Sequence, residues 1–232
     1  MLRVKNLVKK YSDLKVLDNI NFRIDDGEVV SIIGPNGSGK TTLLNLISGL
    51  DKDFSGVINH TTNAKFGFVF QNSDDSVLPW KTVIENIHLH DKNLDKKRIS
   101  KILRETNLWK FRNKYPYQLS GGMKQLLAIS RAFIHECNFI ILDEPFSSLD
   151  CQMASLVRQK LMQLYESEKP TVIIVSHNLD DAILLSDRIV VLSNRPGKIK
   201  GVVNIGLQRP RMESAVLSNE FLDYKREVAK LI

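Results

Sequence analysis

Four short runs of apolar residues, rich in Val and Ile, dominate the hydrophobic pattern of the chain. They are VVSII (29–33), FIIL (139–142), TVIIV (171–175) and IVVLS (189–193). Strands that are apolar on both faces are typical of a parallel sheet covered by helices. Helical patterns lie between the runs, notably TTLLNLISGL after the first and ASLVRQKLMQLYES before the third. The pattern predicts an α/β domain with a mostly parallel core sheet.

The two ends of the chain and its middle differ from this pattern. Residues 2–24 alternate partially and contain turn-like pairs, which predicts antiparallel strands packed on the main sheet. Pro196-Gly197 predicts a turn between two late strands. Residues from about 73 to 135 are mostly helical in pattern and interrupt the strands. We therefore expect one domain over residues 1–232, with an inserted helical subdomain and a short tail from about 206 to 232.

Composition narrows the class of protein. A chain of 232 residues with 43% hydrophobic content can bury a full core. Its apolar runs are far shorter than the roughly 18 residues of a membrane-spanning helix, and MLRVKNLVKK lacks the pattern of a secretory signal. Two cysteines, Cys137 and Cys151, suit a reducing cytosol and have no metal-ligand spacing. We expect no membrane span and no metal site built from protein ligands alone.

The formal net charge of +7 fits a nucleic acid, an anionic membrane surface or an anionic ligand, and does not choose among them. The densest basic run, DKNLDKKRISK (91–101), leads into Ile99, Ile102 and Leu103 at helical spacing. This spacing favours a solvated helix face over a binding patch.

The sequence GPNGSGKTT (34–42) follows the first apolar run and precedes a helical pattern. It matches G-x-x-x-x-G-K-[ST] in the strand-to-helix context that a phosphate-binding loop requires. Backbone N–H groups would face the β- and γ-phosphates, and Lys40 would add a positive charge. The Thr41 hydroxyl would bind Mg²⁺, and Thr42 could contact the α-phosphate. The alternative is a glycine turn that only joins a strand to a helix.

Two carboxylates, Asp143 and Glu144, end the apolar run FIIL in the sequence FIILDEP. Ligands of open α/β sheets bind at the carboxyl ends of strands. Asp143 is the natural Mg²⁺ partner, through water, and Glu144 could orient or deprotonate an attacking water. The alternative is a solvated strand exit whose acids cap a helix.

A second glycine-led helix start lies in LSGGMKQ (119–125). Ser120 can cap the helix, and the exposed N–H groups with the positive end of the helix dipole favour an anion. One chain thus carries two separate anion-binding devices.

Seven motifs in order resemble the ATP-binding subunit of an ABC transporter, over roughly residues 2–205. They are Tyr11, the loop at 34–42, Gln71 in FVFQN, LSGGM at 119–123, FIILDE, SSLD at 147–150 and His177 in IVSHN. The resemblance implies a P-loop NTPase fold of the ABC type, with an N-terminal antiparallel β-subdomain and an inserted helical subdomain. Taken singly, Tyr11 could be an ordinary strand aromatic, Gln71 a surface polar residue and His177 a histidine without a ligand.

The resemblance also assigns roles. It implies that Tyr11 stacks on adenine, and that ATP is bound by Tyr11, Val16, Asn36, Gly37, Ser38, Gly39, Lys40, Thr41, Thr42, Gln71, Ser120, Gly121, Gly122 and Asp150. It implies Glu144, His177, Lys40 and Gln71 as catalytic residues, and Thr41, Gln71 and Asp143 as ligands of Mg²⁺. Met123 stands where the family has Gln, and a thioether cannot donate a hydrogen bond.

Partners follow from the same resemblance. It implies a head-to-tail homodimer in which LSGGM binds the γ-phosphate of the ATP held by the other subunit. It further implies membrane permease subunits, an indirect link to a solute-binding protein, and a peripheral position at the cytoplasmic face of the membrane. We hypothesise that Leu78, Trp80 and Val83 line a groove for a permease helix; ordinary core packing of Trp80 is the alternative.

The transported solute is indicated only by subgroup features. LPW, LSGGM, LSNRPGKI and the late Arg209-Pro210-Arg211 resemble bacterial importers of nitrate, sulfonate or taurine. A rival function is that of a non-transport ABC ATPase that acts on ribosomes or DNA, which the +7 charge suits. Such proteins usually carry two cassettes in one chain or a long coiled-coil insertion, and this sequence has neither. We therefore expect no nucleic-acid partner. A P-loop kinase would leave LSGGM and SSLD unexplained.

Overall fold

The computed structural model describes residues 1–61, 64–89 and 94–232. The chain forms two compact units. Unit 1 comprises Met1–Ala64 and Thr171–Ile232, and unit 2 comprises Lys65–Pro170. The phosphate loop belongs to unit 1, whereas LSGGM and the acidic pair Asp143-Glu144 belong to unit 2.

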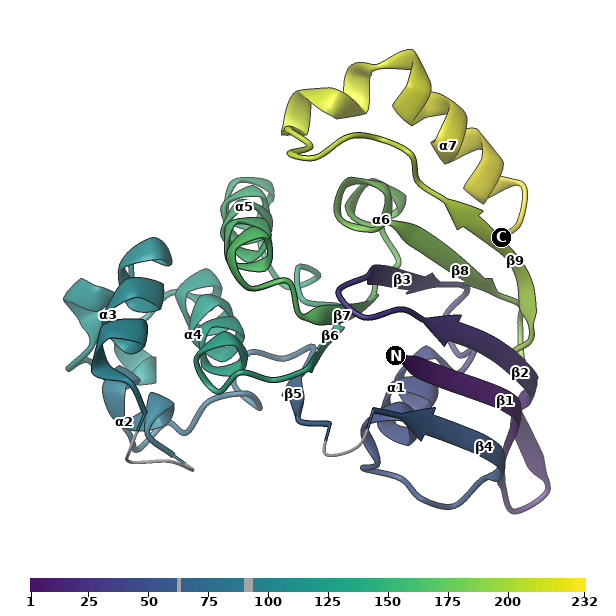
Figure 1. Ribbon diagram of the computed structural model, residues 1–232, viewed down its shortest axis with the longest axis horizontal. Helices are drawn as coiled ribbons and strands as arrows, with labels where there is room; N and C mark the ends of the chain where they lie inside the picture. The colour runs from purple at the N-terminus through teal and green to yellow at the C-terminus, as the bar shows by residue number, and fades with distance from the viewer. Residues whose placement is uncertain (62–63, 90–93) are drawn as a thin grey trace. The chain divides into compact units, whose positions relative to one another are not determined.

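An antiparallel sheet opens unit 1, as the partial alternation predicts. It consists of β1 (Leu2–Tyr11), β2 (Leu14–Ile24) and β4 (Ser55–His60) in the order β2-β1-β4 (Figure 1). Leu2 of β1 pairs with Ile24 of β2 on one side and with His60 of β4 on the other. Alternate apolar residues of β1 are buried, so this sheet has one face in the core of unit 1.

The second sheet of unit 1 contains the apolar runs. In it β7 (Thr171–Val175), β3 (Val29–Ile33), β8 (Arg188–Leu192) and β9 (Ile199–Asn204) lie side by side in that order. β3 is parallel to β7 and β8, and β9 returns antiparallel to β8. Every residue of β3 and β7 is buried, which explains why these strands read as continuous apolar runs.

The helices of unit 1 are α1 (Lys40–Ser48), α6 (Leu179–Leu185), η3 (Glu213–Leu217) and α7 (Asn219–Ala229). Contacts join α6 to β3, to η3 and to α7, so the C-terminal tail packs beside the parallel sheet. Phe221 and Val228 of α7 are fully buried. The tail is therefore an integral layer of unit 1.

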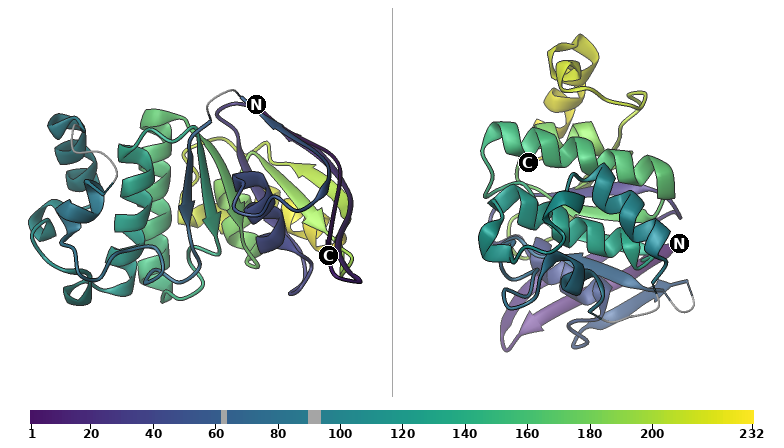
Figure 2. Two further views of the ribbon diagram at one scale, coloured as in Figure 1. Left: turned by 90° about the horizontal axis from the view of Figure 1, so that it is seen from below. Right: turned by 90° about the vertical axis from the view of Figure 1, so that its left-hand side faces the viewer.

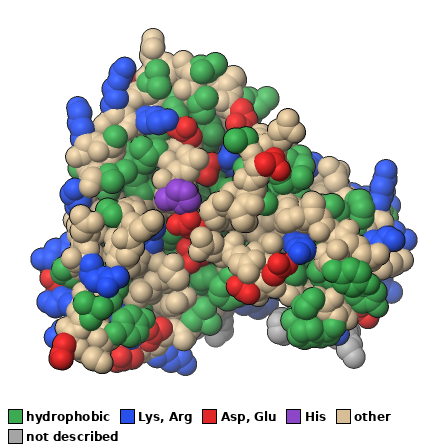
Figure 3. Space-filling model, turned by 180° about the vertical axis from the view of Figure 1, so that it is seen from behind, with side chains coloured by type: hydrophobic (Ala, Val, Ile, Leu, Met, Phe, Trp, Pro, Cys, Tyr) green, Lys and Arg blue, Asp and Glu red, His purple; other side chains and the backbone are tan. Residues whose placement is uncertain are grey.

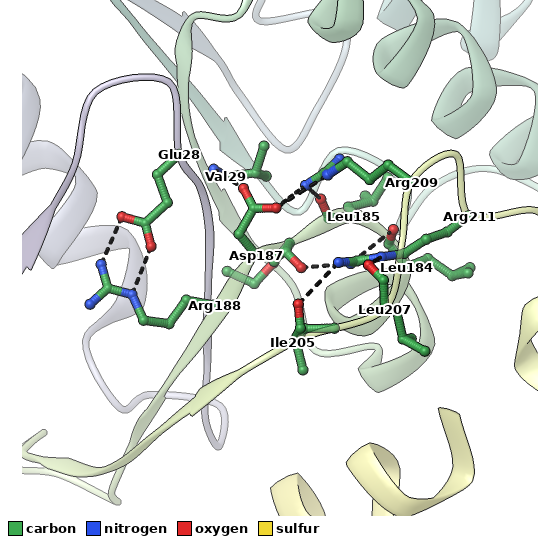
Figure 4. A network of polar contacts seen from close by, with 12 residues as sticks. Glu28, Val29, Leu184, Leu185, Asp187, Arg188, Ile205, Leu207, Arg209 and Arg211 are labelled. Atoms are coloured by element: carbon green, nitrogen blue, oxygen red, sulfur yellow. Dashed lines mark hydrogen bonds and ion pairs between the residues drawn. The ribbon is translucent and has the colours of Figure 1, made fainter. Parts of the chain in front are cut away.

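Two arginines attach this tail to unit 1 (Figure 4). Arg209 pairs with Asp187 at 2.8 Å, and Asp187 also accepts a hydrogen bond from the backbone N–H of Val29 at 2.9 Å. Arg211 donates to the carbonyl oxygens of Ile183 and Ser186 at 2.7 and 2.6 Å, at the C-terminal end of α6. Burial lowers the pKa of Arg211 to about 10, so its guanidinium remains charged at neutral pH.

Unit 2 combines a parallel strand pair with helices. β5 (Phe66–Val69) pairs with β6 (Phe139–Asp143), and every residue of β6 is buried. The helices are α2 (Val83–Ile87), α3 (Lys96–Glu105), η1 (Trp109–Phe111), η2 (Pro116–Gln118), α4 (Gly121–Ile134) and α5 (Cys151–Glu168). α4 packs against β5, α3 and α5 and is drawn between the two helices in Figure 1; Figure 2 gives two further views of these helices.

The basic run of α3 behaves as a solvated helix face where it is described. Ile99, Ile102 and Leu103 are its buried residues, and Lys97 and Lys101 are exposed. Residues 91–93 of the run lie outside the described residues. Within the described ranges, none of the helices combines the length and the apolarity that crossing a bilayer requires.

Candidate nucleotide site

The loop at residues 34–39 joins β3 to α1 in unit 1 and leaves the start of that helix open. Gly39 is the N-cap of α1, no side chain caps it, and the first turn carries no acidic residue. The first backbone N–H groups of a helix have no partner within the helix. The partial positive charge of the helix start favours an anion, so the loop has the chemistry of a phosphate site.

Lys40 is the first residue of α1, and its side chain reaches back to this loop. Its Nζ donates to the carbonyl oxygens of Gly34 and Pro35 at 2.9 and 3.0 Å, and the residue is only 7% exposed. The backbone N–H of Ser38 points to the same Pro35 oxygen at 3.2 Å. An ammonium group and a backbone donor therefore converge on the inside of the loop.

The remaining predicted residues of the loop surround this interior. Asn36, Gly37 and Thr41 are exposed, Thr42 is half-buried, and Ser38 is fully buried. Val16 of β2 packs beneath the loop, since a β-carbon built on Gly39 would lie 3.1 Å from Val16 Cγ1. Val16 is 5% exposed and so supports the loop by packing.

Tyr11 ends β1 and presents a half-exposed ring. Lys9 Nζ lies 4.6 Å from the ring centroid, and the Tyr11 hydroxyl donates to Asp51 Oδ2 at 3.3 Å. Lys9 is buried and pairs with Asp51 at 2.9 Å. The hydrogen bond from Lys9 lowers the pKa of Asp51, and the same contact raises the pKa of Lys9. A cation below the ring fixes its orientation and leaves its other face for a planar ligand.

His177 follows β7 on the short link to α6. The link is fixed on its far side, because Asn178 Oδ1 accepts from the backbone N–H of Asp180 at 2.8 Å and caps α6. The His177 side chain is exposed. The structure thus places an exposed imidazole at the carboxyl end of a parallel strand, where ligands of such sheets bind.

In unit 2 the acidic pair lies at the carboxyl end of β6. Asp143 is the last residue of the strand and is 5% exposed. Glu144 follows with φ of 46° and is half-buried, and Ser147 Oγ donates to its carbonyl oxygen at 3.0 Å. A positive φ is uncommon for a residue other than glycine and marks a sharp change of chain direction. Glu144 therefore lies at a bend of the backbone directly after the strand that Asp143 ends.

LSGGM forms the start of α4, as predicted. Ser120 is the N-cap, and its Oγ accepts from the backbone N–H of Met123 at 3.3 Å. Gly121 begins the helix, and Gly122 is buried against the side chain of Met153 on α5. Asp150 caps α5 by accepting from the N–H of Met153 at 2.9 Å. Met153 thereby links the N-terminal ends of α4 and α5.

Gln71 is exposed just after β5, and the residues that follow it are tied to α4. Lys124 Nζ pairs with Asp74 at 2.6 Å, and Arg131 donates to the carbonyl oxygen of Ser76 at 2.7 Å. Burial lowers the pKa of Arg131. The sequence analysis did not identify Lys124 or Arg131 as functional residues. Their only sequence signal is a spacing of seven residues, which places both on one face of α4.

Comparison with known proteins decides the family. A family model described as ABC transporter matches residues 17–147, which is more than half of the chain. This chain belongs to the ABC transporter family. An uncharacterized ABC transporter ATP-binding protein of Methanocaldococcus jannaschii is 38% identical over 247 residues, which cover 100% of this chain and 91% of that protein. The aliphatic sulfonates import ATP-binding protein SsuB of Bacillus cereus is 40% identical over 97% of this chain and 91% of its own length.

Solved ABC cassettes share the fold. The dimeric bacterial ABC transporter cassette MJ0796 superposes with a TM-score of 0.76 at 32% identity, covering 90% of this chain and 100% of that chain. CbiO1 of Clostridium perfringens superposes with a TM-score of 0.79 at 27% identity, over 98% and 94%. A post-hydrolysis structure of MJ0796 contains ADP and phosphate. The ABC transporter chain is accordingly an ATP-binding and ATP-hydrolysing subunit, and the predicted α/β fold of the ABC type is confirmed.

Proposed function

We propose that this ABC ATPase energises the import of a small organic anion of the sulfonate class. The SsuB relatives support this choice, at 40% identity in Bacillus cereus and 40% over 88% of this chain in Pseudomonas syringae. Taurine and nitrate are the neighbouring solutes of the same predicted subgroup. Uptake of labelled alkanesulfonate into cells with and without this chain tests the class, with taurine and nitrate as competitors. Competition by nitrate alone would contradict the sulfonate assignment.

The observation that carries the mechanism is that one chain has two helix starts suited to anions, α1 at Gly39 and α4 at Ser120. Two copies arranged head to tail would bind each ATP between the phosphate loop of one and LSGGM of the other. ATP would then stabilise the dimer, because it binds both copies at once. The dimeric MJ0796 structure supports the pairing of two copies by similarity.

Each predicted residue has a role in this proposal. Tyr11 stacks on adenine and Val16 supports the loop, while Lys40 and the N–H groups of the loop bind the phosphates. Around them the nucleotide is contacted by Asn36, Gly37, Ser38, Gly39, Thr41, Thr42, Gln71, Ser120, Gly121, Gly122 and Asp150. Met123 leaves only the backbone N–H groups as donors at its position, because its thioether cannot donate.

The reaction uses a water molecule and a cation. Thr41, Gln71 and Asp143 offer hydroxyl, amide and carboxylate oxygens, the hard donors that Mg²⁺ prefers. When bound, Mg²⁺ supplies charge neutralisation at the phosphates. Glu144 orients or deprotonates the attacking water, and His177 and Gln71 contact the γ-phosphate end. Lys40 would contribute a positive charge beside the phosphate chain.

A mixed-dimer experiment tests the shared site. Lys40→Ala damages the loop of one chain, and Ser120→Arg blocks the signature of another. A dimer with one chain of each variant contains one site in which the phosphate loop of the Ser120→Arg chain faces the LSGGM of the Lys40→Ala chain. That site carries neither change, so we expect the mixture to bind more ATP than either variant alone. Complete absence of ATP binding in the mixture would count against the head-to-tail arrangement.

Glu144→Gln tests the chemical step separately. The amide cannot take a proton, so turnover should fall by about 10² to 10⁴ while ATP still binds. The variant should accumulate as an ATP-bound dimer on size-exclusion chromatography, with wild-type protein in ADP as the monomeric control. Rapid hydrolysis by this variant would remove Glu144 from its role.

The permease partner would dock on unit 2 around Trp80. Asn86 is fully buried and holds the preceding loop, because its Oδ1 accepts from Leu78 N at 2.8 Å and its Nδ2 donates to Lys81 O at 2.9 Å. Trp80, on this fixed loop, is 70% exposed. Large exposed aromatic residues are enriched at centres of protein interfaces. Val83 is fully buried, so the expectation that it lines a groove for a permease helix is wrong.

The wider setting follows from this partner. The chain would be peripheral at the cytoplasmic face of the membrane, attached to permease subunits and linked through them to a solute-binding protein. We assign residues from about 73 to 135 to the helical subdomain that meets the permease. Residues from about 206 to 232 form the short tail.

The rival function, an ATPase that acts on ribosomes or DNA, predicts a continuous basic surface. On the face drawn in Figure 3, Lys and Arg side chains are scattered among Asp and Glu and form no single patch. Electrostatic binding of nucleic acid depends on clustered cations. Copurification with an integral membrane protein, rather than with ribosomes or DNA, would separate the two functions.

A further inference from the structure

The turn between β8 and β9 contacts the phosphate loop at two consecutive carbonyl groups. This turn, residues 193–198, is called the β8–β9 turn below. Arg195 Nε donates to the carbonyl oxygen of Gly37 at 3.1 Å. Gly197 lies so close to the carbonyl oxygen of Ser38 that a β-carbon built on it would be 2.2 Å away. Both contacts lie within unit 1 and join segments about 160 residues apart in the sequence.

The β8–β9 turn is itself held in place by hydrogen bonds. Gly197 N donates to Val16 O at 2.8 Å, and Asp18 N donates to Gly197 O at 3.0 Å, which attaches the turn to β2. Lys198 N donates to Ser193 Oγ at 2.9 Å and closes the turn. A segment bonded on both sides can hold the loop that it touches.

These contacts determine where the loop donors point. In a planar trans peptide the C=O and the N–H of the same unit point in opposite directions. Holding the carbonyl oxygens of Gly37 and Ser38 against the β8–β9 turn therefore directs the N–H groups of Ser38 and Gly39 away from it. The N–H of Ser38 accordingly faces the loop interior, where it donates to Pro35 O at 3.2 Å, the oxygen that Lys40 also contacts.

Arg195 also places an uncompensated positive charge beside the loop. Its side chain is exposed, and no carboxylate within the described ranges lies within ion-pair distance of it. A β-carbon built on Gly37 would lie 3.2 Å from an Arg195 terminal nitrogen, so the guanidinium covers this glycine. A cation beside a phosphate site increases the affinity of the site for anions.

We propose that Arg195 is a positioning residue for ATP, which orients the N–H donors of the phosphate loop through Gly37 and adds positive charge at the loop. Gly197 serves the same function through Ser38. The proposal rests on the assignment of residues 34–42 as the phosphate site. It concerns binding of the phosphate chain and not the chemical step.

Nucleotide affinity provides the test. We expect Arg195→Ala to raise the Kd for ATP about tenfold and the Kd for inorganic pyrophosphate by the same factor, measured calorimetrically on the purified chain. The kcat at saturating ATP should stay within about twofold, because the proposed role is in binding. Arg195→Lys keeps the charge but loses the planar donor, so its Kd should lie between the two. Gly197→Ala should also raise the Kd, because its β-carbon displaces the Ser38 carbonyl.

Controls separate this effect from net charge and from folding. Lys200→Ala removes an exposed positive charge from β9, whose side chain donates to Ile232 O, and should leave the Kd within about twofold of wild type. Faster hydrogen exchange at the Ser38 and Gly39 amides in Arg195→Ala, at unchanged Tm, would support positioning over general destabilisation.

Two outcomes are decisive. If Arg195→Ala binds ATP and pyrophosphate as tightly as Lys200→Ala while Lys40→Ala binds weakly, the proposal is overturned and the phosphate site stands. If Lys40→Ala also binds normally, the assignment of the phosphate site itself fails, and with it the role of Arg195.

Discussion

Lys124 and Asp74 form an ion pair of 2.6 Å that joins the signature helix α4 to the segment just after Gln71. Arg131, two turns further along α4, reaches the same segment at the carbonyl oxygen of Ser76. Both contacts lie within unit 2. They connect the segment after Gln71, which is expected to contact the γ-phosphate, with α4. The start of α4 is expected to contact the ATP held by the other subunit. We therefore expect a change at Gln71 to be transmitted to α4.

The first prediction concerns this connection. Lys124→Met and Asp74→Asn should each lower the ATPase rate about two- to fivefold while ATP affinity stays within twofold, because a partly exposed ion pair is worth up to about 1 kcal/mol. A steady-state assay of the two single variants and the double variant tests it. The double variant should be no slower than either single one. Additive losses would show that the two residues act separately.

Trp80 supplies the second prediction. Trp80→Ala should leave the fold and basal ATPase unchanged but reduce copurification with the membrane subunit at least tenfold, because an exposed aromatic anchor often contributes 2 kcal/mol or more, on the order of interface hot spots. Leu217→Ala, at an 81% exposed apolar residue of the tail, is the matched control. Equal recovery of the membrane protein with both variants would refute docking at Trp80.

The third prediction concerns the tail. Arg211→Met keeps the aliphatic stem but removes donors to the carbonyl oxygens of Ile183, Ser186 and Leu207, which lie 2.6 to 3.0 Å away. The free energy of unfolding should fall by about 2 kcal/mol, since hydrogen bonds from a charged donor contribute more than neutral ones. Urea unfolding measures it, with the exposed Arg226→Met as control. Similar losses in the two variants would contradict a specific anchor.

The fourth prediction concerns acid stability. Lys9 lowers the pKa of Asp51, so the Asp51 carboxylate stabilises the folded chain above its ordinary pKa of about 3.9. This stabilisation is lost as the pH falls through the lowered pKa of the folded state. The pKa of Lys9 is raised, so Lys9 stays charged throughout the acid range.

Asp51→Asn should therefore be less stable than wild type at neutral pH, and the difference should shrink as the pH falls below about 4. Urea unfolding at several pH values measures this difference, with the exposed Asp13→Asn as control. A difference that stays constant down to about pH 2 would show that the carboxylate charge of Asp51 contributes nothing.

Much of the fold follows from local patterns. The buried strands β3 and β7 appear in the sequence as unbroken apolar runs, because both of their faces are covered. Ser120 was predictable as the cap of α4 because a cap is a contact over three residues. Motif order was likewise sufficient to indicate the ABC family, which the family match confirms.

Contacts between distant segments carried no such signal. Val83 was expected to line a groove, yet it is fully buried at the start of α2, directly after the N-cap residue Thr82. Asn86 reads as an ordinary polar residue until its four hydrogen bonds to the Trp80 loop are seen.

The sequence by itself determined the α/β class, the two glycine-led helix starts and the family, because strand burial, helix capping and loop chemistry depend on neighbouring residues. Only the tertiary structure decided that Arg195 and Gly197 hold Gly37 and Ser38, and that Lys124 reaches Asp74. The residues of each pair are far apart in the sequence and come together only when the chain folds. A hydrogen bond between such residues depends on their distance and angle in space, so it produces no repeating pattern in the sequence.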